Sequence, residues 1–305
     1  MTATARHPGL SVVLTSRDDP WLFRALRAVQ QTRPGGEPLE TVVVLHRSRP
    51  DYTRRVLAAA DAFGRPITVC ALDDDPTISG ARNCGAGQAA HRTLLFLDSD
   101  CELAPDALRG LARWSGAVAN GRVVFRPGGS AFSRNNCLLR EIGYQGLRGR
   151  MPYMPNLLID RDVFDRVGGF RPDLSCGEDF ELGDRLVRAG AAPEYLPGLT
   201  VTHLDDQHWT KTLRNWFRNG RGGGTRRLLA PPAERRSRRP LFLVVPQEWS
   251  RHGPQYAAVS LLGSLVLALG YLAGRARPAL RPVPPLAAYP PAPAWVRRLS
   301  REGTQ

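Results

Sequence analysis

The sequence predicts an α/β fold in which a doubly wound, mostly parallel sheet carries helices on both faces. The first observation is that short, continuous apolar segments alternate with amphipathic segments over residues 10–97. Continuous apolar segments indicate strands that are buried on both faces, as in a parallel sheet. The second observation is that polar residues follow these segments, at the strand ends where α/β proteins bind ligands. Strand–helix–strand units of this kind have right-handed crossovers.

The first half of the chain alternates strands and helices without interruption. Pro20 favours the start of the first helix, because its fixed φ suits the first helical position. Leu22, Leu26 and Val29 then recur at helical spacing on one face. Gly64 ends the second helix, as glycine commonly does. We expect strands over residues 10–15, 41–45, 67–72 and 93–97, and helices over residues 20–33, 51–63 and 79–90.

The second half of the chain is less regular. Residues 128–150 are rich in glycine and arginine and are expected to form a loop or short helices. After His203, aromatic and arginine residues are interleaved, and residues 221–224 are expected to be flexible. We expect strands over residues 118–125, 156–159, 194–196 and 199–203, a helical turn over residues 162–168, and a helix that ends at Ala189.

Length, charge and cysteines limit the class of protein. The 305 residues suffice for one large α/β domain with extensions. The formal net charge of +14 favours partners that carry phosphate, such as nucleotides or anionic lipids. No known nucleic-acid motif is visible, so we expect no nucleic-acid partner. The five cysteines show no C-x-x-C spacing, which indicates reduced thiols in a protein that faces the cytosol, and no export signal is expected at the start of the chain.

The strand over residues 93–97 runs directly into Asp98-Ser99-Asp100. Because this strand is expected to be central, both aspartates should emerge at the rim of the sheet. Two carboxylates so close together repel each other, and a bound cation relieves the repulsion. Hard oxygen ligands that leave coordination positions open suit Mg²⁺ or Mn²⁺ shared with a diphosphate. The alternative is a pair of solvated acids before a helix that starts near Pro105.

Two further motifs can carry chemistry. Residues 79–85 place a glycine and Arg82 at a helix N-terminus, which suits a diphosphate. Gly168-Gly169-Phe170 lets the backbone approach a ligand. Glu178 and Asp179 begin the following helix, where a carboxylate can act as a general base. Each motif alone also fits an ordinary helix start with surface charges.

In their order along the chain, these motifs resemble those of family 2 glycosyltransferases with the GT-A fold. The resemblance covers about residues 10–205 and rests on Ala81-Arg82-Asn83-Cys84-Gly85, Leu97-Asp98-Ser99-Asp100, Gly168-Gly169-Phe170 and Glu178-Asp179-Phe180-Glu181-Leu182. It implies an inverting enzyme that uses a divalent metal ion to move a sugar from a nucleotide diphosphate to an acceptor hydroxyl. We therefore expect a GT-A catalytic domain over residues 1–205, a basic acceptor-side segment and linker over 206–250, an apolar helix over 251–275 and a disordered tail over 276–305.

The resemblance also assigns roles by position. Asp100 and Asp98 would hold the metal ion, and His203 would complete that site. Asp179 would deprotonate the acceptor hydroxyl, with Glu178 beside it. Asp98 would also meet the ribose or sugar of the donor. The full set of implied donor-binding residues is Thr15, Arg17, Asp18, Asp74, Arg82, Asn83, Asp98, Ser99 and Gly169.

Two departures from the family pattern concern the donor. The first strand ends in Thr15-Ser16-Arg17-Asp18, where the family usually has a proline-containing turn with Tyr-Asn. The second strand ends in Leu45-His46-Arg47-Ser48, where the family usually has Asp-Asp-Gly-Ser. One acidic contact to the nucleotide is therefore missing, and Asp73 or Asp74 would supply a substitute.

The C-terminal part bears on the acceptor. Residues 214–218 are expected to line the acceptor groove or close over the donor, and the absence of a glutamine-arginine-tryptophan signature favours a single sugar transfer. The apolar run over residues 256–273 is close to the minimum length of a membrane span, or it is a helix packed on the catalytic domain. Because nucleotide sugars are cytosolic, we expect the cytoplasmic side of the cell membrane, with a lipid-linked, natural-product or soluble acceptor.

Two other functions fit parts of the sequence. A sugar-phosphate nucleotidyltransferase shares the sheet architecture, but it normally has a glycine-rich loop where this chain has Arg17-Asp18-Asp19-Pro20. A non-catalytic polyanion binder on a degenerate transferase fold would explain the excess of arginine. The intact acids Asp98, Asp100 and Asp179 favour the enzyme.

Overall fold

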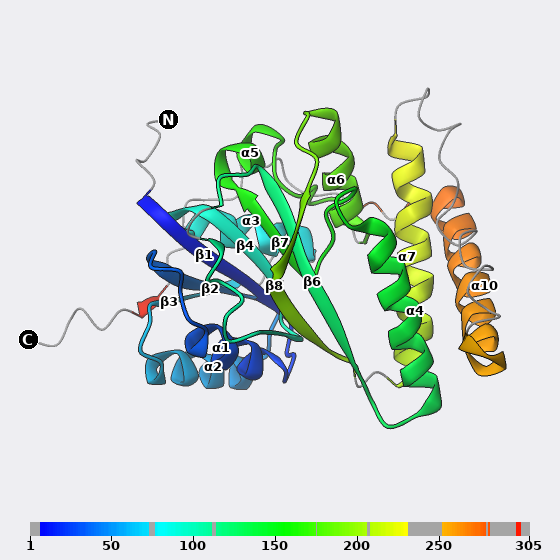
Figure 1. The fold of residues 1–305 in the computed structure, drawn as a ribbon, viewed down its shortest axis with the longest axis horizontal. Helices are drawn as coiled ribbons and strands as arrows, with labels where there is room; N and C mark the ends of the chain where they lie inside the picture. Colours follow the sequence, from blue (N-terminus) through cyan, green and yellow to red (C-terminus); the bar gives the residue numbers. More distant parts are fainter. Residues whose placement is uncertain are drawn as a thin grey trace, which may run out of the picture.

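A mixed sheet of nine strands forms the centre of the molecule, and helices cover both of its faces (Figure 1). The structure is a computed structural model that describes residues 7–72, 77–111, 114–174, 176–205, 208–230, 252–278, 280 and 297–299. The strands are β1 (His7–Ser16), β2 (Leu39–His46), β3 (Ile67–Leu72), β4 (His91–Asp98), β5 (Cys101–Leu103), β6 (Val118–Pro127), β7 (Asn156–Asp160), β8 (Glu194–Asp205) and β9 (Arg297–Leu299). The helices are α1 (Leu22–Gln31), α2 (Pro50–Ala62), α3 (Ile78–Gln88), α4 (Ala131–Leu147), α5 (Arg161–Arg166), α6 (Glu178–Arg188), α7 (Trp209–Leu229) and α10 (Pro254–Ala276).

The strand order β5-β8-β6-β7-β4-β1-β2-β3-β9 confirms the expected α/β architecture. Strands β4, β1, β2 and β3 are parallel neighbours, as expected for the first half of the chain. The chain moves outward from β1 to β3 and then returns to place β4 on the other side of β1. The order therefore reverses between β1 and β4, at the position where α/β sheets bind ligands. Beyond β4 the sheet is mixed, because β7 is antiparallel to both β4 and β6.

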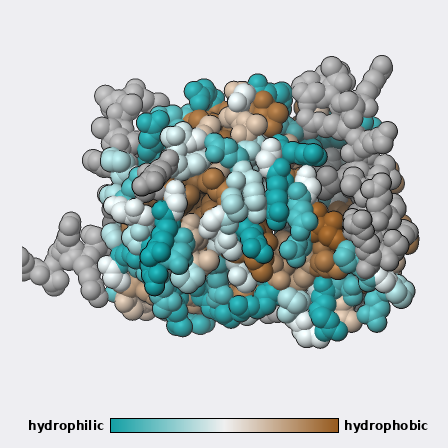
Figure 2. Space-filling model, viewed as in Figure 1, coloured by the Kyte–Doolittle hydropathy of each residue, from teal (hydrophilic) through white to brown (hydrophobic). Residues whose placement is uncertain are grey.

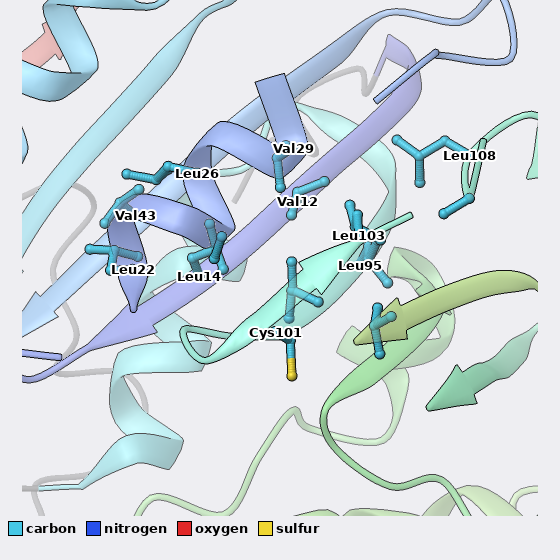
Figure 3. Close-up of a cluster of buried hydrophobic side chains, with 14 of the residues drawn as sticks. Val12, Leu14, Leu22, Leu26, Val29, Val43, Leu95, Cys101, Leu103 and Leu108 are labelled. Atoms are coloured by element: carbon cyan, nitrogen blue, oxygen red, sulfur yellow. The ribbon is translucent and has the colours of Figure 1, made fainter. Parts of the chain in front are cut away.

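Two apolar layers enclose the parallel strands. Side chains alternate between the two faces of a strand, so Leu14 of β1 packs in one layer and Val13 in the other. Figure 3 shows the first layer, to which α1 contributes Leu22 and Leu26. Burial of each leucine contributes about 1.5–3 kcal/mol. A shift of β1 by one residue would exchange the two layers, so this packing determines which residues reach the end of the strand.

One long helix, α4, occupies most of residues 128–150, where a loop or short helices were expected. It has 17 residues, and the hydroxyl of Ser130 caps it by accepting a hydrogen bond from the Ser133 amide at 3.0 Å. Gly143 and Gly146 each lower helix propensity by about 1 kcal/mol, and they face open space. The helix packs against β6 and α10. This tertiary packing outweighs the local preference that predicted a loop.

Helix α7 contradicts the expected flexibility of residues 221–224, which lie in its interior. A Cβ atom at Gly220 or Gly224 would overlap a carbonyl oxygen of α10, that of Leu267 or of Tyr271. The glycines therefore serve close packing between helices and not chain flexibility. The fold differs from expectation at two other points. Strand β8 is one long strand and not two, with an irregularity opposite Gly121 of β6. Helix α3 is capped by Thr77 and begins one residue before the expected range of 79–90.

The C-terminal apolar run forms α10, which packs along α7 at one end of the molecule (Figure 1). Within the described residues, α10 is the one helix that is long and apolar enough to cross a membrane by length and composition. Residues 206–207 and 231–250 of the expected acceptor-side segment and linker, and most of the expected tail, lie outside the described residues. Within that tail Arg297–Leu299 form β9, antiparallel to β3, in place of the expected disorder.

Candidate active site

Acidic side chains gather at the carboxyl ends of β1 and β4. Asp98 is the last residue of β4 and lies in register with Thr15 of β1. Ser99 and Asp100 then form the turn to β5. The hydroxyl of Ser99 donates a hydrogen bond to the Asp19 carboxylate at 2.7 Å, which ties this turn to the loop after β1. The expected position of both aspartates at the rim of a central strand is confirmed.

Arg82 joins Asp98 to the start of α6. Its side chain, on the first half of α3, is only 4% exposed. One guanidinium nitrogen, Nη2, donates to Asp98 Oδ1 at 2.9 Å, and the other, Nη1, donates to Glu178 Oε1 at 2.6 Å. Burial opposes the charge of the guanidinium, but Asp98 and Glu178 outweigh burial and raise the pKa of Arg82. One permanent positive charge therefore holds two carboxylates from distant parts of the chain in one site.

Asn83 and Gly169 shape the turn that follows α5. The amide nitrogen of Asn83 donates to the Phe170 carbonyl at 2.7 Å, and its amide oxygen accepts from the Phe170 N–H at 2.9 Å. Gly169 has a φ of +65°, and a Cβ atom there would lie 2.8 Å from Asn83 Oδ1. Phe170 in turn lies under Arg82, whose guanidinium carbon is 5.4 Å from the ring centroid. Both Asn83 and Gly169 are engaged in this structure, and a direct contact with the donor stays a prediction.

Asp179 has the properties of a general base. It lies in the first turn of α6, and its carboxylate accepts hydrogen bonds from the N–H groups of Phe180 at 2.8 Å and Met154 at 3.4 Å. Burial raises the pKa of Asp179 to about 6, and the neighbouring Glu178 adds to the rise. A carboxylate with this pKa is ionised at neutral pH, yet it accepts a proton more readily than an ordinary aspartate.

Asp100, His203 and Cys101 place ligand atoms within 4.8 Å of one another. His203 on β8 lies opposite Cys101 of β5, and His203 Nε2 is 3.5 Å from Asp100 Oδ2. Burial, together with Arg140 and Lys211, lowers the pKa of His203 well below its usual value. The imidazole is therefore neutral at pH 7, which is the form that binds metals. Burial raises the pKa of Asp100 to about 7, and Asp98 and Asp19 add to the rise.

The donor set of this group fits Mn²⁺. A carboxylate and an imidazole with open positions suit Mn²⁺, whereas Mg²⁺ prefers oxygen ligands alone. Burial and the nearby acids raise the pKa of Cys101 well above its usual value, so its thiol stays protonated and is a poor ligand. Asp98 is not part of this group within the described residues, and its Oδ1 accepts a hydrogen bond from Arg82. Its role as a metal ligand stays a prediction.

Arg140 belongs to the site although no motif pointed to it. Its Nη2 lies 3.0 Å from His203 Nε2, and its guanidinium carbon stands 4.3 Å from the centroid of the Phe125 ring. Arg140 was missed because its segment was expected to be a loop. The helical spacing of Cys137, Arg140 and Tyr144 is the signal that would have shown one inward face.

The end of β1 and the loop after it contain further residues that were predicted to bind the nucleotide-sugar donor. Thr15 is buried and Arg17 is exposed. Asp18, with a φ of +57°, accepts hydrogen bonds from the backbone and side chain of Arg49 at 3.0 and 3.2 Å, so it is tied to the start of α2. Asp19, which the sequence did not single out, accepts the hydrogen bond from Ser99. Asp74 lies outside the described residues.

Known proteins resemble the chain in sequence and in fold. The family model for Glycosyl transferase family 2 matches residues 11–168. The fold is similar to that of the mannosyltransferase PcManGT from Pyrobaculum calidifontis in complex with GDP-Man and Mn2+, with a TM-score of 0.56 and 16% identity over 91% of this chain and 77% of that one. It is also similar to GalNAc-T7 with UDP, GalNAc and Mn2+, with a TM-score of 0.50 and 17% identity over 66% of this chain and 44% of that one. No curated protein sequence is significantly similar to the chain.

Proposed function

Because the chain belongs to glycosyltransferase family 2, we propose that it moves a sugar from a nucleotide diphosphate to an acceptor hydroxyl with inversion of the anomeric carbon. The GT-A fold expected from the sequence is confirmed by the similarity to PcManGT. That protein was solved with GDP-Man and Mn2+, and GalNAc-T7 with UDP, GalNAc and Mn2+. These ligands support a nucleotide-sugar donor and a divalent metal ion for this chain.

The Arg82 bridge is the observation that carries the proposal. It holds Asp98, at the end of β4, and Glu178, at the start of α6, on one guanidinium. Asp179 is the next residue after Glu178, so the candidate base is linked through Glu178 and Arg82 to Asp98, which is proposed to bind the donor. A direct displacement needs this arrangement, because both substrates must meet at the anomeric carbon in a defined orientation.

In the proposed reaction, the Asp179 carboxylate takes the proton of the acceptor hydroxyl. The hydroxyl oxygen attacks the anomeric carbon while the bond from that carbon to the diphosphate oxygen breaks, and the nucleoside diphosphate leaves with the bonding electrons. A single displacement of this kind inverts the configuration of the sugar. We propose that the donor is bound by Thr15, Arg17, Asp18, Asp74, Arg82, Asn83, Asp98, Ser99 and Gly169.

Asp100 and His203, with Asp98 as a further candidate, are proposed to hold the metal ion. The proposal is supported by the neutral imidazole of His203 and by its distance of 3.5 Å from the Asp100 carboxylate. Mn²⁺ fits this pair better than Mg²⁺. When bound, such an ion neutralises the negative charge that develops on a leaving diphosphate.

We place the enzyme at the cytoplasmic side of the cell membrane, with residues 1–205 as the catalytic domain and 206–250 on the acceptor side. Helix α10 supports this location, since its 23 residues are apolar enough to contact a bilayer. A membrane location favours an acceptor that is lipid-linked, or a natural product that partitions into the membrane. The absence of the processive signature supports the transfer of one sugar per acceptor.

A screen of nucleotide sugars for a Mn²⁺-dependent rise in melting temperature tests the donor class. With the donor that gives the largest shift, Asp179→Asn is expected to keep the shift and to lose transfer by roughly 10²–10⁴-fold. Asp61→Asn, which changes an exposed acid of α2, is the matched control. Turnover near that of the wild type in Asp179→Asn would contradict the base assignment. The anomeric configuration of the product, measured by NMR, tests inversion.

A further inference from the structure

Helix α10 packs on α7 through its small residues. A Cβ atom at Gly270 or Gly274 of α10 would overlap the carbonyl oxygen of Phe217 or Arg221 of α7. The reciprocal glycines on α7 meet α10 in the same way, so the two backbones touch over several turns. Close packing through small residues is how helices associate where lipid surrounds them.

The opposite face of α10 carries large apolar side chains. Leu261, Leu262, Leu265, Leu269 and Leu272 are between 40% and 62% exposed in the described structure. Their spacing places them on one face of the helix. The helix is therefore inverted relative to a helix of a soluble protein, because glycine faces the protein and leucine faces outward. Figure 2 shows hydrophobic surface in the region of α4 and α7, and an exposed apolar patch marks a contact with a partner or a membrane.

A pocket with two arginines flanks this leucine face at its C-terminal end. It is open, has a volume of about 320 Å³, and is lined by Phe217 and Arg221 of α7 and by Ala273, Ala276 and Arg277 of α10. No ion pair holds Arg221 or Arg277 within the part of the chain that the structure describes. The lining is mainly apolar and includes two arginines, and this combination suits a phosphate that is attached to a hydrocarbon chain.

We propose that this pocket binds the phosphate headgroup of an anionic bilayer lipid, while the leucine face of α10 lies against the acyl chains. The inference rests on the proposed membrane location, but it does not depend on the transfer reaction. A lipid is favoured over a second copy of the chain, because each copy carries a net charge of +14 and the arginines would face each other.

The same packing argues that α10 lies in the plane of the membrane surface and does not cross it. Helix α7 is in backbone contact with α10 and carries Lys211, Arg214, Arg218, Arg221, Arg226 and Arg227. If α10 crossed the bilayer, these charges would enter the hydrocarbon, which costs several kcal/mol for each buried charge. An in-plane helix keeps them at the headgroups, where each arginine is favourable.

Binding of the full chain to vesicles tests the proposal. We would measure co-sedimentation with vesicles of phosphatidylcholine alone and with vesicles of equal parts phosphatidylcholine and phosphatidylglycerol. Arg221→Gln/Arg277→Gln is expected to weaken binding to the anionic vesicles roughly 25-fold, at about fivefold for each arginine. The control Arg27→Gln/Arg54→Gln removes the same charge from exposed positions of α1 and α2 and is expected to have a much smaller effect. Leu265→Glu/Leu269→Glu is expected to lose binding to both vesicle types.

Several results would overturn the proposal. Equal weakening by the pocket variant and its control would show only general attraction between charges. Resistance of the bound protein to alkaline carbonate would show that α10 spans the bilayer. A dimer in light scattering that Leu265→Glu/Leu269→Glu dissociates would assign the face to a second copy. A melting shift with inorganic phosphate, without vesicle binding, would assign the pocket to a free phosphate. The donor-dependent melting shift, measured on each variant, separates these results from a failure of the proposed transferase function.

Discussion

Replacement of Arg82 by methionine is expected to destabilise the protein by about 4 kcal/mol at neutral pH. The side chain of Arg82 is 4% exposed, and its partners Glu178 and Asp98 are 12% and 28% exposed. Removal of one partner of a buried ion pair costs about 3–5 kcal/mol, because the remaining charge is stranded. The pair with Glu178 belongs in that range, whereas the more exposed pair with Asp98 adds at most about 1 kcal/mol.

Urea unfolding and melting temperature measure this loss. A change of 4 kcal/mol corresponds to a fall of roughly 10 °C for a chain of this size. The double variant Arg82→Met/Glu178→Gln is expected to recover on the order of 1–2 kcal/mol, because it removes the charge that is stranded most deeply. The control is Arg92→Met. Arg92 also meets two carboxylates, those of Asp160 and Asp162, but it is 61% exposed, so its loss should leave the melting temperature close to that of the wild type.

The reasoning fails if Arg82→Met unfolds at the same urea concentration as the wild type, or if Arg92→Met loses as much stability. The first result would mean that Asp98 and Glu178 are well solvated without Arg82, and the second would mean that burial of the arginine does not set the cost of its removal. Recovery in the double variant distinguishes a stranded charge from lost packing against Phe170, since removal of a charge does not restore packing. Wild-type stability would also remove the structural basis for placing Asp98 and Asp179 in one site.

Three further predictions concern the metal, the base and the helix pair. Asp100→Ala is expected to abolish Mn²⁺-dependent nucleotide binding in calorimetry while the protein stays folded; unchanged affinity would exclude it as a ligand. Because the pKa of Asp179 is about 6 and the base must be ionised, kcat/KM should fall about tenfold per pH unit below pH 6. The charged groups that act on this carboxylate are Glu178 and Arg82. Asp179→Asn should remove the acidic fall in the pH profile of kcat/KM. Gly224→Ala should lower the melting temperature because its Cβ meets α10, whereas Gly223→Ala, whose Cβ lies 3.8 Å from Tyr271, should raise stability by about 0.5–1 kcal/mol. Equal changes at both glycines would contradict the described contact.

The parallel half of the sheet could be predicted because its signal is local. Continuous apolar runs, each followed by a turn, place β1 and β4 and therefore bring Asp98 to the rim. The pairing of Asp98 with Arg82 and Glu178 could not be predicted in this way, since it depends on how α6 returns to the sheet. The family resemblance named Asp98, Arg82 and Glu178 as site residues, but it did not predict that Arg82 binds both carboxylates.

Helix α7 was missed, and α4 was expected only as a loop or short helices, for a physical reason. Glycine in α4 and α7 lowers helix propensity, and a reading of local preference therefore favours a loop. In α7 the glycines are instead the contact surface for α10, a role that depends on a partner helix far along the chain. Arg140 was lost with α4, because a residue in a loop has no inward face. His203 was named because the family resemblance assigns it by position, at the end of a strand pattern that remains visible in the sequence.

The bonds that close the site also bear on how the chain folds. Asn83 meets Phe170 across a separation of 87 residues, and Arg82 meets Glu178 across 96. Contacts between residues so far apart in the sequence form late in folding, because the entropy cost of closing the loop comes before their favourable energy is gained. A partly folded chain therefore has β1 to β4 in place before it has a binding site. Nucleotide sugar present during refolding should stabilise the finished protein without accelerating the slow step, since the donor recognises only what that step creates.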